Sequence, residues 1–271
     1  MAGSTSSGCI YTGVGGWTYE PWRDNFYPKG LPHARELDYA GQHLTAIEIN
    51  GTYYGTQKRE TWQKWAAAVP EGFVFTAKAS RFCTNRKVLA DGADSIAKFL
   101  GQGIAELGPK LGPILWQFMG TKRFERDDFA RFLDLLPAEQ EGVRLRHAIE
   151  PRHESFVCAE FVELARDRGC AVVFADHAEY PMIADLTAPF VYARLQQSRA
   201  DEPTGYDAAE LDRWAGIARA WAAGKAPEGL AYAAPATDGA KARDVFLFFI
   251  AGAKERNPAA AQALIAKVQD A

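Results

Sequence analysis

The segment Thr45–Tyr54, TAIEINGTYY, decides how the rest of the chain is interpreted. Apolar and polar residues alternate from Ala46 to Asn50, the pattern of a β-strand with one buried face. Gly51 allows a sharp turn, so Glu48 and Asn50 are expected near the carboxyl end of this strand. Ligands bind at that end of the strands in α/β proteins. We therefore expect a pocket whose lining includes these two side chains.

The same kind of strand recurs along the chain and alternates with helical patterns. Eight β-rich segments occur, at Ile10–Val14, Ala46–Asn50, Phe73–Lys78, Ile114–Phe118, Leu145–Glu150, Ala171–Asp176, Phe190–Leu195 and Val245–Ile250. Apolar residues at helical spacing fall in Leu37–His43, Glu60–Ala68, Ile96–Leu107, Asp127–Leu136, Ala159–Arg168, Ala208–Ala222 and Pro258–Val268. This alternation predicts a single TIM-like (β/α)₈ barrel with an irregular or missing sixth helix. An open, doubly wound sheet is the alternative.

Composition is that of an ordinary globular chain of 271 residues, 48% hydrophobic and 24% charged. No apolar run approaches the ~20 residues that span a bilayer, so no membrane association is expected. Residues 1–8 lack the features of a signal peptide and are interpreted as a disordered tail on a cytoplasmic protein. Residues 9–271 are expected to form one domain. The Ala, Gly and Pro-rich stretch 223–243 is interpreted as an insertion before the eighth strand, on the face opposite the mouth.

Cysteine usage and charge narrow the classes of function. The four cysteines, Cys9, Cys83, Cys158 and Cys170, show no zinc-type spacing and are expected to be reduced and mostly buried thiols. Cys83, in the polar segment RFCTNR, is the one candidate for an exposed, reactive thiol. The net charge of −3 does not favour a protein that coats itself with nucleic acid, since such binding needs a basic face. Nothing in the sequence sets an oligomeric state.

Polar side chains follow the predicted strands where each one ends, and all are expected to face one mouth. They are Glu48 and Asn50, Lys78, Gln117, Glu150 and Arg152, Asp176, and Arg194. A folded core does not need so many converging charges, because unpaired buried charge costs several kcal/mol. Ligand binding is the simpler interpretation, and a salt-bridged plug formed by the same groups is the alternative.

An aromatic loop follows the first strand. Residues 15–28, GGWTYEPWRDNFYP, include five aromatic side chains, and we expect the loop to fold over part of the mouth, with Trp17 among the ligand contacts. A hydrophobic cap that seals the barrel is the alternative. Tyr53 and Tyr54 are expected to extend the same wall.

Five motifs carry a family resemblance. GVGGWTYEPWRDNFYP, AIEINGTYYG, WQKWAAAVPEGFVFTAKAS, LGPILWQF and AIEPRHESF, in this order, resemble the YecE-like family of uncharacterised barrels (domain of unknown function seventy-two). The resemblance implies a TIM-barrel fold and no established reaction. By position, the family's characteristic polar residues fall on Glu48, Asn50, Tyr54, Lys78, Gln117, Glu150, Arg152, His153, Asp176, Tyr192 and Arg194.

The sequence departs from the family pattern at three places. Thr84–Asn85 stands where a threonine–histidine pair is usual, Gln196–Gln197 replaces a histidine–glycine pair, and the usually asparagine-rich end of the eighth strand is Ile250, Ala251, Gly252. A function that needs those groups is therefore in doubt for this chain.

The favoured hypothesis is an enzyme, a hydrolase, lyase or isomerase, acting on a small anionic or polyhydroxylated substrate. Glu48 and Glu150 would be its acid and base, because two carboxylates in different environments can hold different pKa values. A phosphate or carboxylate would be bound by Lys78, Arg152 and Arg194. The remaining expected ligand contacts are Asn50, Tyr54, Gln117, His153, Asp176, Tyr192 and Trp17.

Two alternatives stay open. A divalent metal, less favoured, would take Glu48, Glu150, His153 and Asp176 as ligands and support phosphodiester processing. A non-catalytic barrel would instead hold a metabolite or a nucleic-acid phosphate at a basic rim, although the net charge does not favour nucleic acid.

Overall fold

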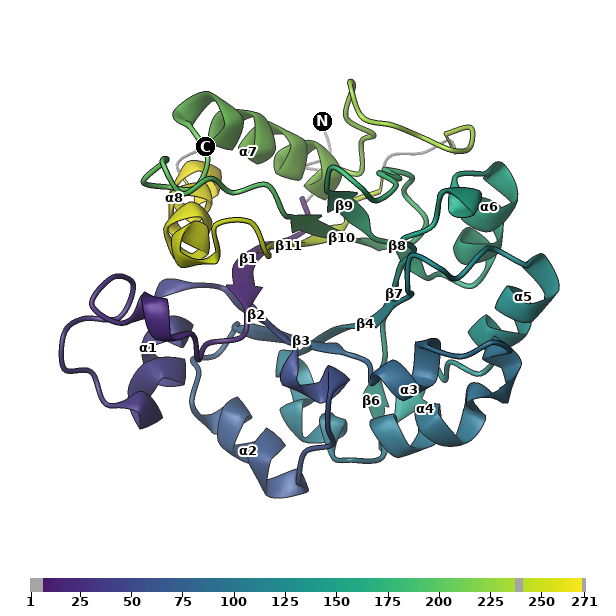
Figure 1. Ribbon diagram of the computed structural model, residues 1–271, viewed down its shortest axis with the longest axis horizontal. Coiled ribbons are helices and arrows are strands. Elements are labelled where there is room, and N and C mark those ends of the chain that lie inside the picture. The colour runs from purple at the N-terminus through teal and green to yellow at the C-terminus, as the bar shows by residue number, and fades with distance from the viewer. Residues whose placement is uncertain (1–6, 237–240, 270–271) are drawn as a thin grey trace, which may run out of the picture.

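The predicted alternation of strands and helices builds a ring of parallel strands surrounded by helices (Figure 1). The computed structural model describes residues 7–236 and 241–269. Most of the predicted tail, residues 1–6, and residues 237–240 of the predicted insertion lie outside the described residues. Gly8, at the end of that predicted tail, donates its backbone N–H to the carbonyl of Ala222 at 3.0 Å.

The strands form one nine-membered sheet. In chain order they are β1 Ile10–Gly15, β2 Ala46–Ile49, β3 Val74–Lys78, β4 Leu111–Gln117, β7 His147–Glu150, β8 Ala171–Val172, β9 Phe174–Asp176, β10 Phe190–Leu195 and β11 Asp244–Phe249. All neighbouring pairs are parallel. Only Val173 separates β8, which pairs with β7, from β9, which pairs with β10. The two pieces act as one sixth strand and close the ring, which confirms the TIM-like barrel.

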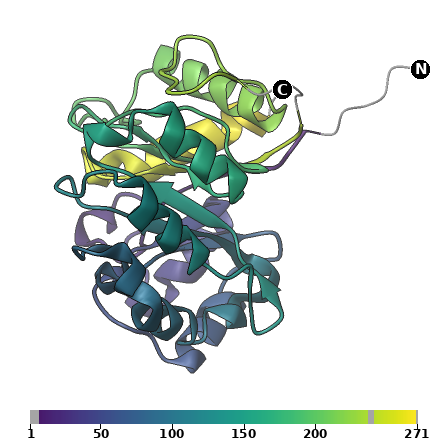
Figure 2. The same cartoon turned by 90° about the vertical axis from the view of Figure 1, so that its right-hand side faces the viewer.

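Helices cover the outside of the ring, as the side view in Figure 2 shows. They are α1 Glu36–His43, α2 Arg59–Ala67, α3 Arg81–Thr84, α4 Ala93–Leu100, α5 Arg126–Asp134, α6 Ala159–Asp167, α7 Ala208–Ala222 and α8 Asn257–Gln269. No helix is found in the described connection between β9 and β10, in line with the irregular sixth unit. A small antiparallel hairpin, β5 Glu139–Gln140 with β6 Val143–Arg144, was not predicted.

The segment that the sequence suggested was a simple insertion covers this irregular unit. Its described part lies between α7 and α6 in Figure 1, where a sixth helix would stand. The carboxylate of Asp185 accepts the backbone N–H groups of Ala233 and Ala234 at 2.7 and 3.1 Å, and Ala184 donates to the carbonyl of Ala231 at 2.8 Å. Residues after the seventh helix therefore complete the sixth unit.

Apolar side chains form two clusters, one on each side of the sheet. The larger lies between strands and helices. The smaller fills the barrel and includes Val74, Leu115, Tyr192, Phe246 and Phe248. Successive residues of a strand point alternately into the barrel and out towards the helices. The inward-facing positions are mostly apolar within the barrel and become polar at the ends of the strands.

Cys83 corrects one expectation. It was the one candidate for an exposed thiol, but its side chain is fully buried, and burial raises the pKa of its thiol to about 12. The short helix α3 turns Cys83 inward and leaves its neighbour Phe82 61% exposed. A polar sequence context did not reveal which side of a single helical turn would face the core.

Within the described parts of the chain, no helix has both the length and the apolar character needed to cross a membrane.

Candidate functional site

Arg194 lies at the centre of the polar cluster, between Glu48 and Glu150. Its Nε and Nη2 donate to the two Glu48 oxygens at 3.1 and 2.9 Å, and its Nη1 donates to both Glu150 oxygens at 3.0 and 2.9 Å. None of the three side chains is more than 3% exposed. One guanidinium thus joins β10, β2 and β7, three strands that are not neighbours in the sheet.

Three further side chains donate hydrogen bonds to the carboxylates of Glu48 and Glu150. The Tyr192 hydroxyl donates to Glu48 at 2.7 Å, and the Gln117 amide donates to Glu150 at 2.7 Å. Arg152 Nε adds a bond of 3.2 Å to Glu150. The contacts of Glu48 and Glu150 are therefore those of the salt-bridged plug, the alternative to direct ligand binding by these two residues.

The charges of this network reinforce one another. Burial disfavours ionised Glu150, but Arg194 and Arg152 outweigh it, so the pKa of Glu150 lies below its usual value. Burial likewise disfavours charged Arg194, but Glu150 and Glu48 raise its pKa. Burial, and then Glu48, raises the pKa of Tyr192 well above its usual value. At neutral pH the network holds Glu150 as a carboxylate, Arg194 as a cation and Tyr192 as a phenol.

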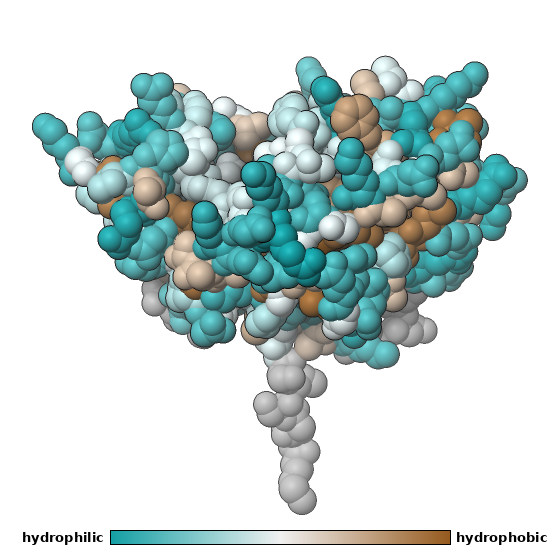
Figure 3. All heavy atoms as spheres, turned by 90° about the horizontal axis from the view of Figure 1, so that it is seen from below, coloured by the Kyte–Doolittle hydropathy of each residue, from teal (hydrophilic) through white to brown (hydrophobic). Residues whose placement is uncertain are grey.

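A cavity of about 390 Å³ opens above Arg194. The face at the carboxyl ends of the strands, uppermost in Figure 3, is hollowed between two raised parts. Neither glutamate belongs to the lining. It consists of six polar residues, Asn50, Tyr54, Lys78, Arg194, Lys254 and Asn257, together with Gly15, Phe249, Ile250 and Ala251. The cavity therefore presents cations and amides.

Lys78, the last residue of β3, differs from the arginines. Its Nζ lies 4.2 Å from the centroid of the Tyr53 ring. Among residues 7–236 and 241–269, no carboxylate oxygen lies within 4.0 Å of Lys78 Nζ, the distance limit for an ion pair. Burial and the nearby charge of Arg194 lower its pKa to about 8. Lys78 is thus a partly desolvated amine facing a cavity.

Lys254 is a functional candidate that the sequence analysis missed. It begins the 3₁₀ helix Lys254–Arg256 after β11, lines the same cavity, and lies 4.2 Å from the Tyr19 ring centroid. Burial lowers its pKa. Ala251 and Gly252, both with φ of +57°, redirect the chain between strand and lysine. The signal in the sequence was a basic residue shortly after the eighth strand.

Most of the predicted site residues meet at the mouth, and three lie elsewhere. Trp17 packs edge-on against Trp65 and Phe75, at 5.1 and 6.4 Å, in the layer between strands and helices. The aromatic side chains of the loop therefore approach the cavity through Tyr19 and Trp22, whose rings lie 4.2 and 5.8 Å from the Lys254 ammonium group.

His153 and Asp176 also lie outside the network. His153 caps a short 3₁₀ helix through Ser155 and approaches Arg123 at 3.5 Å. The carboxylate of Asp176 accepts from Gln197 at 2.6 Å, and its pKa is raised by burial. Gln197 is one of the residues that depart from the family pattern.

The predicted metal ligands do not converge. In the part of the chain that the structure describes, no three His, Cys, Asp or Glu side chains form a group that could hold a metal ion. Glu48 and Glu150 are instead bridged by Arg194.

A second cavity lies at the rim, beside the mouth. It measures about 420 Å³ and is lined by Thr84, Asn85, Arg86, Lys87, Met119, Thr121, Lys122, Arg123 and Glu125. Two of its cations are already engaged: Arg86 donates to the Ser95 hydroxyl at 2.8 Å and Lys122 pairs with Asp128 at 2.9 Å. Its basic character is therefore partly structural.

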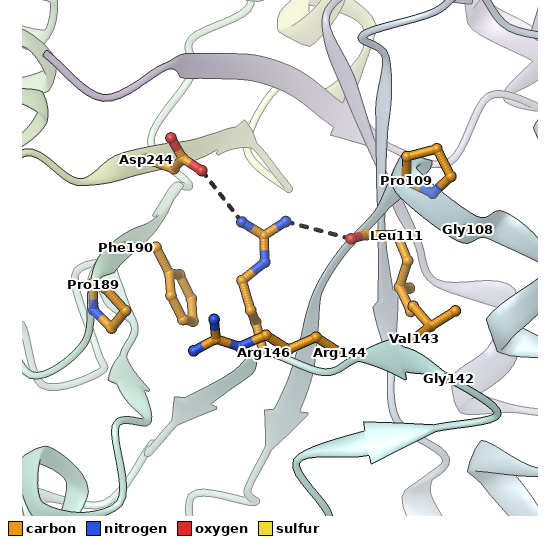
Figure 4. A pocket seen from close by; sticks show the side chains of 10 residues that line it. All are labelled: Gly108, Pro109, Leu111, Gly142, Val143, Arg144, Arg146, Pro189, Phe190 and Asp244. Carbon is orange, nitrogen blue, oxygen red and sulfur yellow. Dashed lines mark hydrogen bonds and ion pairs between the residues drawn. The ribbon is translucent and has the colours of Figure 1, made fainter. Parts of the chain in front are cut away.

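A larger cavity, of about 650 Å³, lies at the opposite end of the barrel, and Figure 4 shows the residues that line it. Its arginine, Arg146, donates to Asp244 and to the carbonyl of Leu111, both at 3.4 Å. The guanidinium lies 4.7 Å from the Phe246 ring centroid. In barrels the amino ends of the strands serve stability, and these contacts fit that role.

Fold and site together define a (β/α)₈ barrel with a charged network and a small polar cavity at the carboxyl ends of its strands. The chain belongs to the family described as protein of unknown function DUF72, whose model matches residues 11–271. This confirms the resemblance inferred from the five motifs.

One protein with a similar sequence and two solved structures with a similar fold can be compared with this chain. The UPF0759 protein YunF of Bacillus subtilis (strain 168) is 27% identical over 114 residues, which span 40% of this chain and 39% of YunF. A DUF72 family protein from Enterococcus faecalis V583 superposes with a TM-score of 0.68 at 19% identity, over 98% of both chains. One from Thermotoga maritima MSB8 gives 0.68 at 20% identity, over 97% of this chain and 98% of the other. These structures show a shared fold.

Proposed function

We propose that the protein binds a small anion, a phosphate or a carboxylate, in the cavity at the mouth of the barrel. The observation that carries the proposal is that Lys78 and Lys254 line one cavity of about 390 Å³ directly above Arg194. An anion between the lysines would supply the negative charge that this side of the network needs.

The charge balance of the mouth supports an anion over a neutral ligand. Arg194 and Arg152 are paired with Glu48 and Glu150, whereas the two lysines contact the faces of tyrosine rings. Partly buried cations are costly without a counter-charge, so a bound anion gains favourable interactions with both. Asn50 and Tyr54, which line the same cavity, can add hydrogen bonds.

The acid–base roles predicted for the glutamates receive less support from this geometry than an electrostatic role does. Both carboxylates lie beneath the cavity and already accept several hydrogen bonds. They fix Arg194 in place, and Arg194 in turn forms the floor of the anion site. Chemistry in the cavity would fall to groups that line it.

Isothermal titration calorimetry with inorganic phosphate and with malonate tests the proposal. We expect wild type to bind at least one of them, and Lys254→Met to weaken binding about tenfold or more, because one charge-assisted contact is lost. Lys98→Met, on the exposed face of α4, is the matched control and should bind like wild type. Absence of binding by wild type at low salt, or equal binding by a Lys78→Met/Lys254→Met double variant, would refute it.

A further inference from the structure

Lys78 has the surroundings of a nucleophilic amine. It is held at the end of β3 with its ammonium group at the cavity wall and the Tyr53 ring 4.2 Å away. Four charged groups act on it: Arg194 and Arg152 favour the neutral amine, and Glu48 and Glu150, which are already bonded to these arginines, oppose them. A lysine placed for an ion pair would have a carboxylate beside it; in the described residues Lys78 has none within 4.0 Å.

A lysine must be unprotonated to attack a carbonyl. Burial and neighbouring positive charge both favour the neutral amine, and the pKa of Lys78 falls to about 8. At pH 7.5 about a quarter of such amines are neutral, against about one in a thousand for an exposed lysine of ordinary pKa. Desolvation next to another cation is an established way of activating a lysine for imine formation.

We propose that Lys78 forms an imine with the carbonyl group of a small anionic aldehyde or ketone. The inference rests on the proposed anion site, because Lys254 would hold the phosphate or carboxylate of the same molecule while Lys78 meets its carbonyl carbon. The cavity, about 390 Å³, accommodates a ligand of a few carbons. Asn50 lines the same wall, and its side-chain amide makes only a long bond of 3.4 Å, to the Glu48 carbonyl, so it is available to the carbonyl oxygen.

The step balances without another reactant. The lone pair of Lys78 Nζ forms a bond to the carbonyl carbon, and the carbonyl π electrons move to oxygen, which takes up a proton. The nitrogen loses one proton, which gives a carbinolamine. The hydroxyl then takes up a second proton and leaves as water while the nitrogen lone pair forms the carbon–nitrogen double bond, and the nitrogen loses its remaining proton. Amine and carbonyl thus give imine and water, and nothing is oxidised or reduced. The imine withdraws electrons from the adjacent carbon, as cleavage or proton removal there requires.

Reductive trapping tests the inference. Full-length protein is incubated at pH 7.5 with glyoxylate or glycolaldehyde phosphate and sodium cyanoborohydride, and adducts are located by intact mass and peptide mapping. We expect one adduct per chain, on Lys78, at probe concentrations at which neutral glycolaldehyde gives none. Lys78→Arg should lose the adduct; Lys254→Met should keep it on Lys78 but need about tenfold more probe. Lys98→Met should behave as wild type.

The outcomes separate the two proposals. Labelling spread over surface lysines, or an unlabelled Lys78 in a protein that binds phosphate by calorimetry, overturns the imine and leaves the anion site standing. An unlabelled Lys78 in a protein that binds no anion overturns both. Thermal unfolding of Lys78→Arg monitors its folding, so that loss of the adduct is not mistaken for loss of structure.

Discussion

Each end of the barrel holds an arginine, and the two arginines are bonded very differently. At the carboxyl end, Arg194 is 3% exposed and makes four short bonds to two glutamates. At the amino end, Arg146 is 29% exposed and makes two bonds of 3.4 Å, to Asp244 and to a backbone carbonyl. Stacking on Phe246 completes its contacts.

The difference teaches that, in this barrel, the larger cavity is not the one that lies over the most buried charges. The larger cavity surrounds an arginine that is partly solvated and satisfied by stacking. The smaller one lies over a fully desolvated network, which is costly to build and is stable only when every member is paired. Partly buried lysines are found above that network. This contrast supports the proposed anion site at the carboxyl end.

The largest effect that would test this comparison is on stability. Arg194→Met leaves Glu48 and Glu150 buried without their counter-charge, and we expect a loss of about 3–5 kcal/mol in the free energy of unfolding. Arg146→Met, at the solvated end, should cost about 1 kcal/mol or less. Urea denaturation of both variants measures the contrast. Similar losses at the two ends would remove the basis of the comparison.

Removing a single hydroxyl group should cause a smaller loss in the free energy of unfolding. Tyr192→Phe removes the donor that lies 2.7 Å from Glu48 and should cost about 1.5–3 kcal/mol, since the bond is to a buried charge. Tyr11→Phe, at the amino end, keeps the ring stacked on Phe246 and should cost less than about 1 kcal/mol. The urea midpoints of the two variants measure both losses. If Tyr11→Phe lowers the midpoint more than Tyr192→Phe does, the predicted difference between the two ends of the barrel is wrong.

The smallest effect has the opposite sign. Folding lowers the pKa of Lys78 from 10.5 to about 8, so the folded state binds this proton less tightly than the unfolded state does. Its contribution to stability is most favourable above pH 10.5 and falls as the pH falls towards about 8. Lys78→Met should therefore be more stable than wild type at pH 7, by on the order of 1 kcal/mol.

The pH dependence of that gain is its check. The difference between Lys78→Met and wild type should shrink between pH 7 and pH 9.5, as wild type loses the unfavourable proton. Chemical denaturation at several pH values measures it, with Lys98→Met as the control that shows no trend. A Lys78→Met variant less stable than wild type at pH 7 would mean that the lysine is a structural contact.

The sequence was sufficient to predict the barrel and the convergence of its inward-facing charged residues. Glu150 is the last residue of its strand, and Glu48 and Arg194 are each one residue before the end of theirs; strand alternation points all three inward, and parallel strands bring such ends together. The irregular sixth unit was also visible, as a missing helical pattern. These features depend on local periodicity, which a single sequence carries.

Asp176 and Trp17 show where periodicity is not enough. The sixth strand is apolar on both faces, so its sequence does not tell which residues point inward, and Asp176 lies beside Gln197 instead of in the mouth. Trp17 follows Gly16, whose φ of +73° turns the chain, and the ring packs behind the sheet. Lys254 was missed for a related reason: its position depends on the loop after β11, and strand periodicity carries no information about the path of a loop.

The closure of the sixth unit by a later segment constrains how the chain is made. Asp185 binds backbone groups of Ala233 and Ala234, so the outer side of the sixth unit has no complete cover until those residues have left the ribosome. A nascent chain that ends near residue 222 has six units with both strand and helix, whereas the sixth unit along the chain has an open apolar outer face. Synthesis from amino to carboxyl terminus therefore leaves this protein without its final protection against misassembly until the last fifth of the chain emerges.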